Sequence, residues 1–225
     1  MRRRLRMLEK KEYAAQLEEM IEKQLRRRGV HDAAVLAAMA EVPRHEFVSE
    51  DVRAHAYDDL PLPIGSGQTI SQPYIVAAMT AALHLRPGDR VLEIGTGCGY
   101  HAAVLSRLAK EVFTIERRPE LASSASATLA RLGYSNAHVH CGDGTLGLPE
   151  LAPFDAILVA AAAPAVPKPL LAQLAEGGRI ILPVGDTQHQ ELQLIEKRGD
   201  AFPMKMLEGC RFVPLLGYHG WQEPP

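Results

Sequence analysis

Apolar residues in the first third of the chain recur at spacings of three and four, which is the period of an amphipathic helix. The longest such pattern covers residues 12–28, and its apolar face consists of Tyr13, Leu17, Met20, Ile21 and Leu25. Gly29 follows as a helix stop. Two more helices are predicted, over residues 32–40 and over residues 73–85, the second with Pro73 in its first turn.

After the turn at residues 87–89, short apolar runs alternate with helical stretches. Strands are predicted at 91–95, 112–116, 137–143, 154–160 and 178–185, and helices near 99–109, 119–132 and 167–175. Buried strands separated by single helices pair in parallel through right-handed crossovers. The pattern therefore predicts an α/β fold with a doubly wound, mostly parallel sheet, to which residues 191–198 and 210–218 add further strands with an antiparallel edge.

The composition of the chain limits the kinds of partner and the cellular location that we expect. The chain has 225 residues, 47% of them hydrophobic, and a net charge of -2, so it can bury one good core and carries no field that attracts nucleic acid or an acidic membrane. Its three widely spaced cysteines fit a reduced, cytoplasmic protein. No run approaches the ~20 apolar residues of a membrane span. The basic start, MRRRLRMLEKKEY, lacks the apolar run of a secretory signal, and we interpret its arginines as a solvated helix end.

The stretch VLEIGTGCGY, residues 91–100, places Gly95, Gly97 and Gly99 between the first predicted strand of the sheet and a helix. Glycines allow a ligand to approach the backbone closely at this point of a doubly wound sheet. Glu116 ends the next strand, 21 residues after Gly95, where a carboxylate can accept hydrogen bonds from both hydroxyls of a ribose. A dinucleotide and S-adenosylmethionine both satisfy these features.

Three details favour S-adenosylmethionine. Tyr100 stands where the dinucleotide fingerprint needs its third glycine. Glu93, two residues before Gly95, suits a cationic amino-acid group better than a diphosphate. Asp143, followed by Gly144, ends the third strand, where a carboxylate can accept from an adenine amino group. Each carboxylate alone is ordinary in a loop, but three at successive strand ends beside a glycine loop indicate a cationic adenosine ligand.

The end of the fourth strand bears on the methyl acceptor. Methyltransferases that act on nitrogen commonly carry an Asn/Asp-Pro-Pro-aromatic motif there, whereas this chain has four alanines, residues 160–163, and then Pro164. A small apolar wall offers no base and no metal ligand. It suits an acceptor that is already anionic at neutral pH, such as a carboxylate with a pKa near ~4.

The segment PLPIGSGQTISQPYI, residues 61–75, presents two hydroxyls, Thr69 and Ser71, beside a Gly-x-Gly bend. A neutral hydroxyl can orient a carboxylate oxygen without competing as a stronger nucleophile. We predict that this segment folds over the cofactor mouth as a lid, with Thr69 and Ser71 touching the acceptor and Pro73 fixing its exit.

These motifs together resemble the protein-L-isoaspartate (D-aspartate) O-methyltransferase family over residues 25–216. The resemblance lies in VPRHEFV, AYDDLPLPIGSGQTISQPYIVAAMT, VLEIGTGCGYHAAVL, IER, GDG, PFDAILVAAAAP, EGGRIILPVG and RFVPL. Of these, GQTISQP is highly specific to the family, while the glycine loop is shared with many methyltransferases. Thr145 and Leu146 depart from the aromatic or basic residues often found after GDG.

The resemblance implies a Rossmann-like class I methyltransferase that methylates the free carboxylate of L-isoaspartyl and D-aspartyl residues, whose ester collapses to a succinimide and so begins repair. It implies a monomer that binds S-adenosylmethionine and no metal. Ser71 matches the catalytic serine, with Thr69 beside it. The implied cofactor-binding residues are Glu93, Gly95, Thr96, Gly97, Gly99, Tyr100, Glu116, Arg117, Asp143 and Gly144, and the implied substrate-binding residues are Tyr57, Ile70, Ser71, Val213 and Pro214.

The resemblance also implies one methyltransferase domain over residues 1–225. Its parts are the N-terminal helices and substrate lid (1–88), the cofactor-binding core (89–186) and the C-terminal strands (187–225).

Two other functions stay open at this point. One is a methyltransferase of the same fold that acts on RNA or a small molecule, and the other is a non-catalytic module that binds S-adenosylmethionine or NAD. His138, His140 and Cys141 form no complete metal-ligand pattern, and Cys98 is interpreted as a small residue in a tight turn.

Overall fold

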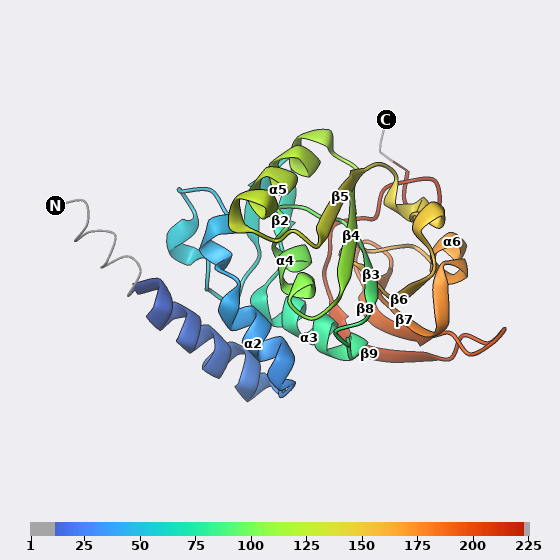
Figure 1. Ribbon diagram of the computed structural model, residues 1–225, viewed down its shortest axis with the longest axis horizontal. Helices are drawn as coiled ribbons and strands as arrows, with labels where there is room; N and C mark the ends of the chain where they lie inside the picture. Colours follow the sequence, from blue (N-terminus) through green and yellow to red (C-terminus); the bar gives the residue numbers. More distant parts are fainter. Residues whose placement is uncertain (1–11, 223–225) are drawn as a thin grey trace.

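The computed structural model describes residues 12–222, so the arginine-rich start and the last three residues lie outside the described residues (Figure 1). The predicted first helix is a continuous helical run from residue 12. It widens into a π-helix over Met20–Leu25 and closes with a 3-10 turn over Arg26–Arg28. Gly29, with φ 92°, ends it in the left-handed conformation that glycine adopts without a steric penalty.

The other two predicted N-terminal helices are also present. α2, Ala33–Glu41, begins where the Asp32 side chain accepts hydrogen bonds from two backbone amides of the first turn. α3, Pro73–Leu83, begins with Pro73 in its first turn and ends at His84 in the left-handed region. The chain between them forms 3-10 turns over Arg44–Phe47 and Arg53–His55.

A seven-stranded sheet forms the centre of the molecule, with strand order β5-β4-β3-β6-β7-β8-β9 (Figure 1). The five strands from β3 to β7 pair in parallel, and β8 and β9 extend the sheet antiparallel. The doubly wound fold with an antiparallel edge is confirmed. The strands are β3 Arg90–Ile94, β4 Glu111–Glu116, β5 Ala137–Cys141, β6 Phe154–Val159, β7 Leu174–Gly185, β8 Gln190–Glu196 and β9 Met204–Cys210.

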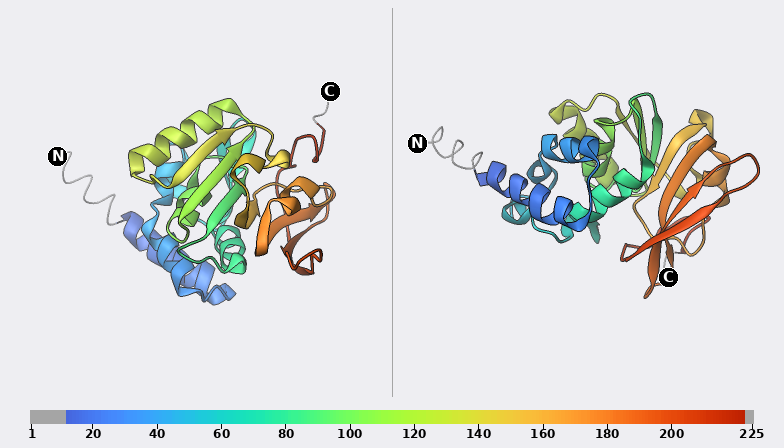
Figure 2. Two further views of the ribbon diagram at one scale, coloured as in Figure 1. Left: turned by 45° about the vertical axis from the view of Figure 1, so that its right-hand side comes forward. Right: turned by 90° about the horizontal axis from the view of Figure 1, so that it is seen from below.

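Each face of the sheet has its own hydrophobic core. α2, α3, α4 (Tyr100–Ser106) and α5 (Pro119–Leu132) cover the face that receives Val91 and Val112. α6, Lys168–Ala172, covers the other face, which receives Leu92 and Ile94. In Figure 2, right, the start of the N-terminal helix lies at the far end of the molecule from the C-terminal strands, while the end of that helix, at Arg28, reaches a cavity also lined by Glu208 of β9. Because the strand order reverses between β3 and β6, a crevice opens at their carboxyl ends.

Two local predictions differ from the structure. The last strand is Met204–Cys210, so the strand predicted at residues 210–218 is wrong. β9 is the edge strand of the sheet, and Met204 and Met206 are about half exposed. Its sequence therefore lacks the alternation of buried and exposed residues by which a strand is predicted. Pro214 has no amide hydrogen with which to continue a ladder, and this segment makes only isolated bridges.

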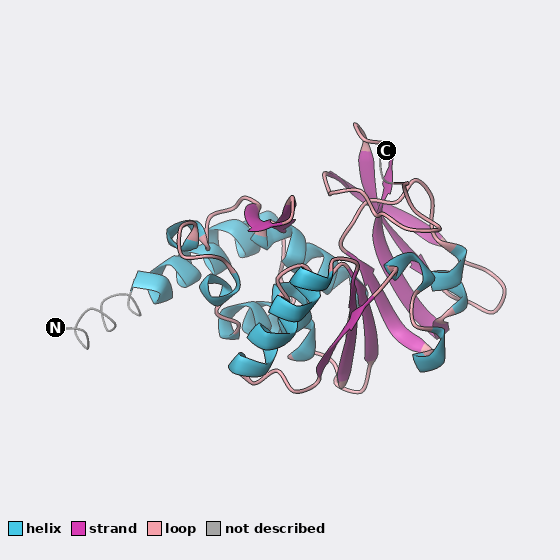
Figure 3. Cartoon of the chain, turned by 90° about the horizontal axis from the view of Figure 1, so that it is seen from above, coloured by secondary structure: helices cyan, strands magenta, loops and turns pink. Residues whose placement is uncertain are grey.

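The second difference concerns the predicted lid, which contains a β-hairpin that the sequence analysis did not anticipate (Figure 3). β1, Leu62–Gly65, pairs antiparallel with β2, Gln68–Ile70. The two residues between them, Ser66 and Gly67, have φ of 51° and 68°. Positive φ at both central residues is the geometry of the tight turn that best fits the twist of paired strands. The strands are too short to show an alternating pattern.

Candidate active site

The glycine loop lies over the crevice between β3 and β6. Gly95 and Thr96 both donate backbone hydrogen bonds to the Ile115 carbonyl on β4, at 2.8 and 3.2 Å. On the other side, the Ala160 amide donates to the Ile94 carbonyl at 2.8 Å. These bonds fix the loop against both neighbouring strands, and a cavity opens directly beyond it.

This cavity brings together residues that the sequence analysis took from six separate segments. Its walls come from the hairpin, the glycine loop, the ends of β4 and β6, the turn after β5, and the C-terminal segment. The predicted site residues among its lining are Thr69, Ile70, Ser71, Gly95, Thr96, Gly97, Tyr100, Glu116, Arg117, Gly144, Val213 and Pro214. Segments far apart in the sequence therefore meet at one place, where a doubly wound sheet binds its ligand.

Glu116 is held rigidly at the end of β4. One carboxylate oxygen accepts from the Gly97 amide at 2.9 Å and the other accepts from the Arg118 amide at 3.0 Å. The side chain is only 7% exposed and lines the cavity. A carboxylate offers about four lone-pair positions, so each oxygen keeps one for a further donor. This arrangement fits the two hydroxyls of a ribose.

Gly97 has a steric reason to be glycine. Its φ of 54° lies in the left-handed region, and a Cβ added there would lie 3.1 Å from Ile64 Cδ1 of the hairpin. The hairpin therefore packs directly against the glycine loop. A side chain at this position would push the hairpin away and occupy space at the edge of the cavity.

Glu93 lies beneath the loop and is fully buried on β3. Its Oε2 accepts from Thr114 Oγ1, whose oxygen also hydrogen-bonds to Thr96 Oγ1 at 2.6 Å. Its Oε1 has no hydrogen-bond partner among the described residues. Burial raises the pKa of Glu93 to about 8, although the Thr114 hydrogen bond opposes the rise. A cationic ligand such as S-adenosylmethionine in the cradle above would favour the ionised form of this buried carboxyl group, whose second oxygen is left without a partner among the described residues.

The structure does not bring four predicted residues to the cavity wall: Tyr57, Glu93, Gly99 and Asp143. The Tyr57 ring is 4% exposed, and its hydroxyl hydrogen-bonds to the His45 ring at 2.7 Å. Gly99 has φ 88°, and a Cβ there would meet Leu129 of α5 at 3.3 Å, so this glycine serves helix packing. Spacing along the sequence could not show which way these four side chains or glycines face, so their predicted ligand contacts stay predictions.

Asp143 holds the C-terminal segment in place. Its Oδ1 accepts from the backbone and the hydroxyl of Thr145, at 2.9 and 2.7 Å, and its Oδ2 accepts from the Tyr218 amide at 2.7 Å. Burial opposes ionisation, but these hydrogen bonds lower the pKa of Asp143 overall. The carboxylate is therefore ionised and largely satisfied by the protein, and its predicted contact with adenine stays a prediction.

A second cavity adjoins the first and shares part of its wall. Thr69, Ser71, Ala160 and Val213 line both cavities. The second cavity is otherwise walled by Arg28, Pro61, Gln72, Ile75 and residues 208–212 of β9 and the segment after it. The two hydroxyls thus lie between a space that fits the cofactor and a space open to a second reactant.

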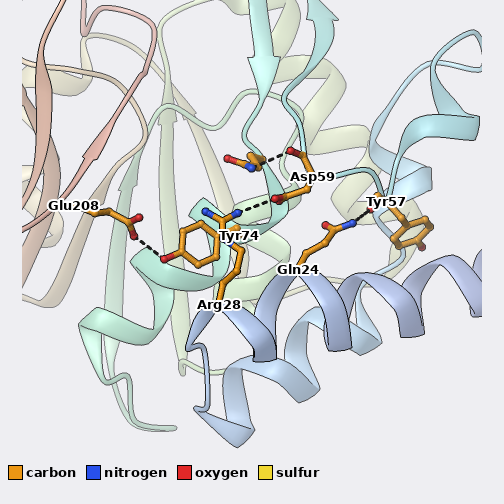
Figure 4. A network of polar contacts seen from close by, with 7 residues as sticks. Gln24, Arg28, Tyr57, Asp59, Tyr74 and Glu208 are labelled. Atoms are coloured by element: carbon orange, nitrogen blue, oxygen red, sulfur yellow. Dashed lines mark hydrogen bonds and ion pairs between the residues drawn. The ribbon is translucent and has the colours of Figure 1, made fainter.

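Polar contacts tie the wall of the second cavity to the N-terminal helix (Figure 4). Arg28 forms an ion pair with Asp59 at 2.7 Å, and its guanidinium lies 3.4 Å from the centre of the Tyr74 ring. The Tyr74 hydroxyl donates to Glu208 of β9 at 3.1 Å. Gln24 donates to the Tyr57 carbonyl at 2.8 Å. These contacts link the helix, the lid segment, α3 and the sheet edge around one opening.

Arg44, to which no role was assigned from the sequence, is a fully buried arginine that anchors the segment predicted to be a lid. Its Nε donates to the Ala56 carbonyl and its Nη2 donates to the Ser71 carbonyl, both at 2.7 Å, while Nη1 has no partner in the described part of the chain. The guanidinium also lies 4.7 Å from the centre of the Tyr100 ring. Arg44 therefore holds both ends of the segment that carries the hairpin. An arginine that follows Val-Pro gives no sequence signal of burial.

Other chemistry is sparse in the described residues. Within residues 12–222, no group of three or more His, Cys, Asp or Glu side chains is placed to hold a metal ion. Nor does any helix in that range have the length and apolar content needed to cross a membrane. Cys98 lines the cavity, and burial raises the pKa of its thiol to about 11, so the thiol is protonated and unreactive at neutral pH.

The fold and the site define a class I methyltransferase dependent on S-adenosylmethionine: the doubly wound sheet carries a glycine loop after β3, Tyr100 stands where a dinucleotide site needs its third glycine, and the carboxyl group of Glu93 is buried beneath the loop. The family model described as Protein-L-isoaspartate(D-aspartate) O-methyltransferase (PCMT) matches residues 15–220. The chain belongs to this family.

Relatives agree with this assignment. Protein-L-isoaspartate O-methyltransferase 1 of Syntrophobacter fumaroxidans is 57% identical over 203 residues, covering 90% of this chain and 95% of that protein. The enzyme of Roseiflexus castenholzii is 59% identical over 195 residues, covering 87% and 89%.

Solved structures show the same similarity. A structure titled protein-L-isoaspartate O-methyltransferase superposes with a TM-score of 0.83 at 32% identity, covering 91% of this chain and 67% of that chain. A Plasmodium falciparum structure, titled a putative protein-L-isoaspartate O-methyltransferase in complex with S-adenosyl-L-homocysteine, has a TM-score of 0.78 at 28% identity and covers 91% and 98%.

The buried carboxyl of Glu93 predicts a pH-dependent stability. Its pKa is near the usual ~4.3 in the unfolded chain and about 8 in the folded, ligand-free protein. Between these values the folded state binds more protons, so the free energy of unfolding falls as pH rises, by at most about 1.4 kcal/mol per pH unit. We expect the free energy of unfolding of Glu93→Gln to lack this fall with pH. Urea unfolding of both proteins at pH 5, 6.5 and 8 measures the free energy of unfolding, and an equal pH dependence in the two proteins would contradict the raised pKa.

The lid anchor gives a second prediction. Arg44→Lys keeps the charge but cannot reach both carbonyls, so we expect the free energy of unfolding to fall by roughly 1–3 kcal/mol. We also expect KM for the methyl acceptor to rise more than Kd for S-adenosylhomocysteine, because the lid carries Ser71. The exposed Arg26→Lys is the matched control and should change neither quantity. Equal changes in acceptor KM and cofactor Kd would reject the assignment of Arg44 to the lid.

Proposed function

We propose that this protein transfers a methyl group from S-adenosylmethionine to the free carboxylate of L-isoaspartyl residues in damaged proteins and peptides, and thereby initiates their repair. One observation carries the proposal: Thr69 and Ser71 lie on the wall shared by the cofactor cavity and the adjoining one. Membership of the isoaspartate methyltransferase family supports the same reaction. We extend the proposal to D-aspartyl residues, which the family name includes.

The cofactor supplies a methyl group on a positively charged sulfur; the C–O bond to the carboxylate forms as the C–S bond breaks, and the bonding pair stays on sulfur. The chain's own residues align the acceptor and exclude water. We propose that Ser71, with Thr69, donates a hydrogen bond to the acceptor carboxylate. The neighbouring wall contains Ala160, whose small apolar side chain offers no base, and an ionised carboxylate requires none.

We assign Glu116 to the ribose hydroxyls, Glu93 and the glycine loop to the cationic part of the cofactor, and the Asp143-Gly144 turn to the adenine end. Glu116 and Gly144 both line the first cavity, which supports the assignments of the ribose and of the adenine end. Thr96, Tyr100 and Arg117 line the same cavity and complete the cofactor set. We assign Ile70, Val213 and Pro214 to the acceptor side. We place Tyr57 behind the lid, as a residue that supports it.

We propose that the protein acts as a cytoplasmic monomer and uses neither nucleic acid nor membrane as a partner. The net charge of -2 supports this because it gives no general attraction to polyanions. The peptide acceptor then enters the second cavity, whose lining includes Arg211 and Glu208 beside the ion pair between Arg28 and Asp59. After esterification, the methyl ester collapses to a succinimide, and hydrolysis of the succinimide restores part of the normal aspartate.

The proposal is tested with two peptides of identical composition, one containing isoaspartate and the other normal aspartate. Labelled S-adenosylmethionine is supplied, and base-labile labelled product is counted. We expect labelling of the isoaspartyl peptide alone. Labelling of neither peptide, with S-adenosylhomocysteine still bound, would refute the acceptor and direct the search to RNA and small molecules.

The role of Ser71 makes a separate prediction. Ser71→Ala removes one hydrogen bond to a charged acceptor, so we expect methyl transfer to slow roughly 10- to 100-fold. Because Ser71 faces the acceptor rather than the adenosine, Kd for S-adenosylhomocysteine should change less than about threefold. Single-turnover rates and equilibrium binding measure the two effects. An equal loss of cofactor binding would remove Ser71 from the acceptor side.

A further inference from the structure

His101 is a cavity residue to which the foregoing assignment gives no function. It lies in the first turn of α4, directly after the glycine loop, and lines the first cavity. Its side chain is 8% exposed and packs toward α3. Polar side chains in such a position are costly to bury unless they have hydrogen-bond partners.

The hydrogen bonds of Thr80 fix which His101 nitrogen carries the proton. Thr80 Oγ1 lies 2.7 Å from the Val76 carbonyl, which can only accept, so the single hydroxyl hydrogen points there. The same oxygen lies 2.9 Å from His101 Nε2 and must therefore accept a hydrogen from it. A neutral imidazole carries one N–H, so Nδ1 has a free lone pair.

The imidazole is also neutral at physiological pH. Burial, together with the nearby positive charge of Arg44, lowers the pKa of His101 to about 3. Protonation would place a second hydrogen-bond donor, on Nδ1, and a positive charge beside the cavity. Neutral His101 instead offers only an acceptor on that nitrogen.

In the proposed assignment, the orientation of the cofactor would bring a cation to this wall. Glu116 at the end of β4 and Gly144 after β5 both line the first cavity and are assigned to the ribose and the adenine end. With the methyl group facing Thr69 and Ser71, the amino-acid part of the cofactor would extend toward the wall formed by α3 and α4. Val76 of α3 and His101 of α4 line that wall.

We propose that His101 recognises the α-ammonium group of S-adenosylmethionine by accepting a hydrogen bond at Nδ1, and that Thr80 is the positioning residue that fixes the required tautomer. The inference deepens the cofactor site of the proposed function. It rests on that proposal for the identity of the cofactor and for the placement of its methyl group beside Thr69 and Ser71.

Two ligands separate this role from a structural one. S-adenosylhomocysteine carries the α-ammonium group, whereas 5′-methylthioadenosine shares the adenosine and thioether and lacks the amino-acid part. We expect His101→Phe to weaken S-adenosylhomocysteine binding at least about 10-fold, as a lost hydrogen bond to a charged group does, and to change 5′-methylthioadenosine binding less than twofold. Isothermal titration with each purified variant measures both constants.

Matched variants sharpen the comparison. His101→Asn keeps an acceptor near the Nδ1 position and should recover most of the S-adenosylhomocysteine affinity. Thr80→Val should weaken S-adenosylhomocysteine about threefold with no effect on 5′-methylthioadenosine, and Thr80→Ser should restore binding. Glu116→Ala is the contrasting control, because the ribose is common to both ligands and both should weaken together.

The outcomes are decisive either way. Equal losses for both ligands in His101→Phe, or no loss for S-adenosylhomocysteine, would overturn the proposal. Circular dichroism shows whether His101→Phe folds. If it does not, Thr80→Val, Thr80→Ser and His101→Asn allow the same comparison of S-adenosylhomocysteine with 5′-methylthioadenosine. Absence of isoaspartyl methylation by the wild-type protein, with selective loss in these variants, would refute the proposed acceptor while supporting the role of His101.

Discussion

The reversal of strand order between β3 and β6 is the constraint on which the rest of the site depends. Parallel strands end at one edge of the sheet, and where their connections leave in opposite directions no helix fills the space above them. The end of β3 and the glycine loop are joined by backbone bonds to both sides, to Ala160 after β6 and to Ile115 on β4. Glu116, Gly144 and Ala160 are then brought to the same opening by the strand ends that carry them.

The lid depends on a different kind of interaction, a buried cation that holds main-chain carbonyls. Arg44 fixes the Ala56 and Ser71 carbonyls, and Ile64 of the hairpin rests on Gly97 of the loop. The segment is therefore restrained at its base by hydrogen bonds and over the cavity by packing. A guanidinium suits the first task because its planar donors reach two carbonyls at once. Such a restraint explains how a short, polar hairpin can keep two hydroxyls between two cavities.

The sequence allowed the sheet and much of the site to be predicted because both leave periodic or spaced signals. Apolar runs between helices defined the parallel strands, and carboxylates at strand ends pointed to Glu116. It could not show that Glu93 is buried beneath the loop or that Asp143 turns toward Tyr218, because spacing does not give side-chain direction. Arg44 and His101 escaped notice because their roles come from tertiary contacts made with distant segments.

The contribution of the C-terminal segment to the cavity affects how the protein folds during synthesis. Residues between Gln68 and Leu216 line one cavity, so the binding surface exists only after these distant segments have been made and folded together. Long-range contacts of this kind carry a loop-closure cost and form late. During synthesis, therefore, cofactor binding cannot stabilise the emerging chain, which must reach its sheet and helices unaided before any ligand contributes to its stability.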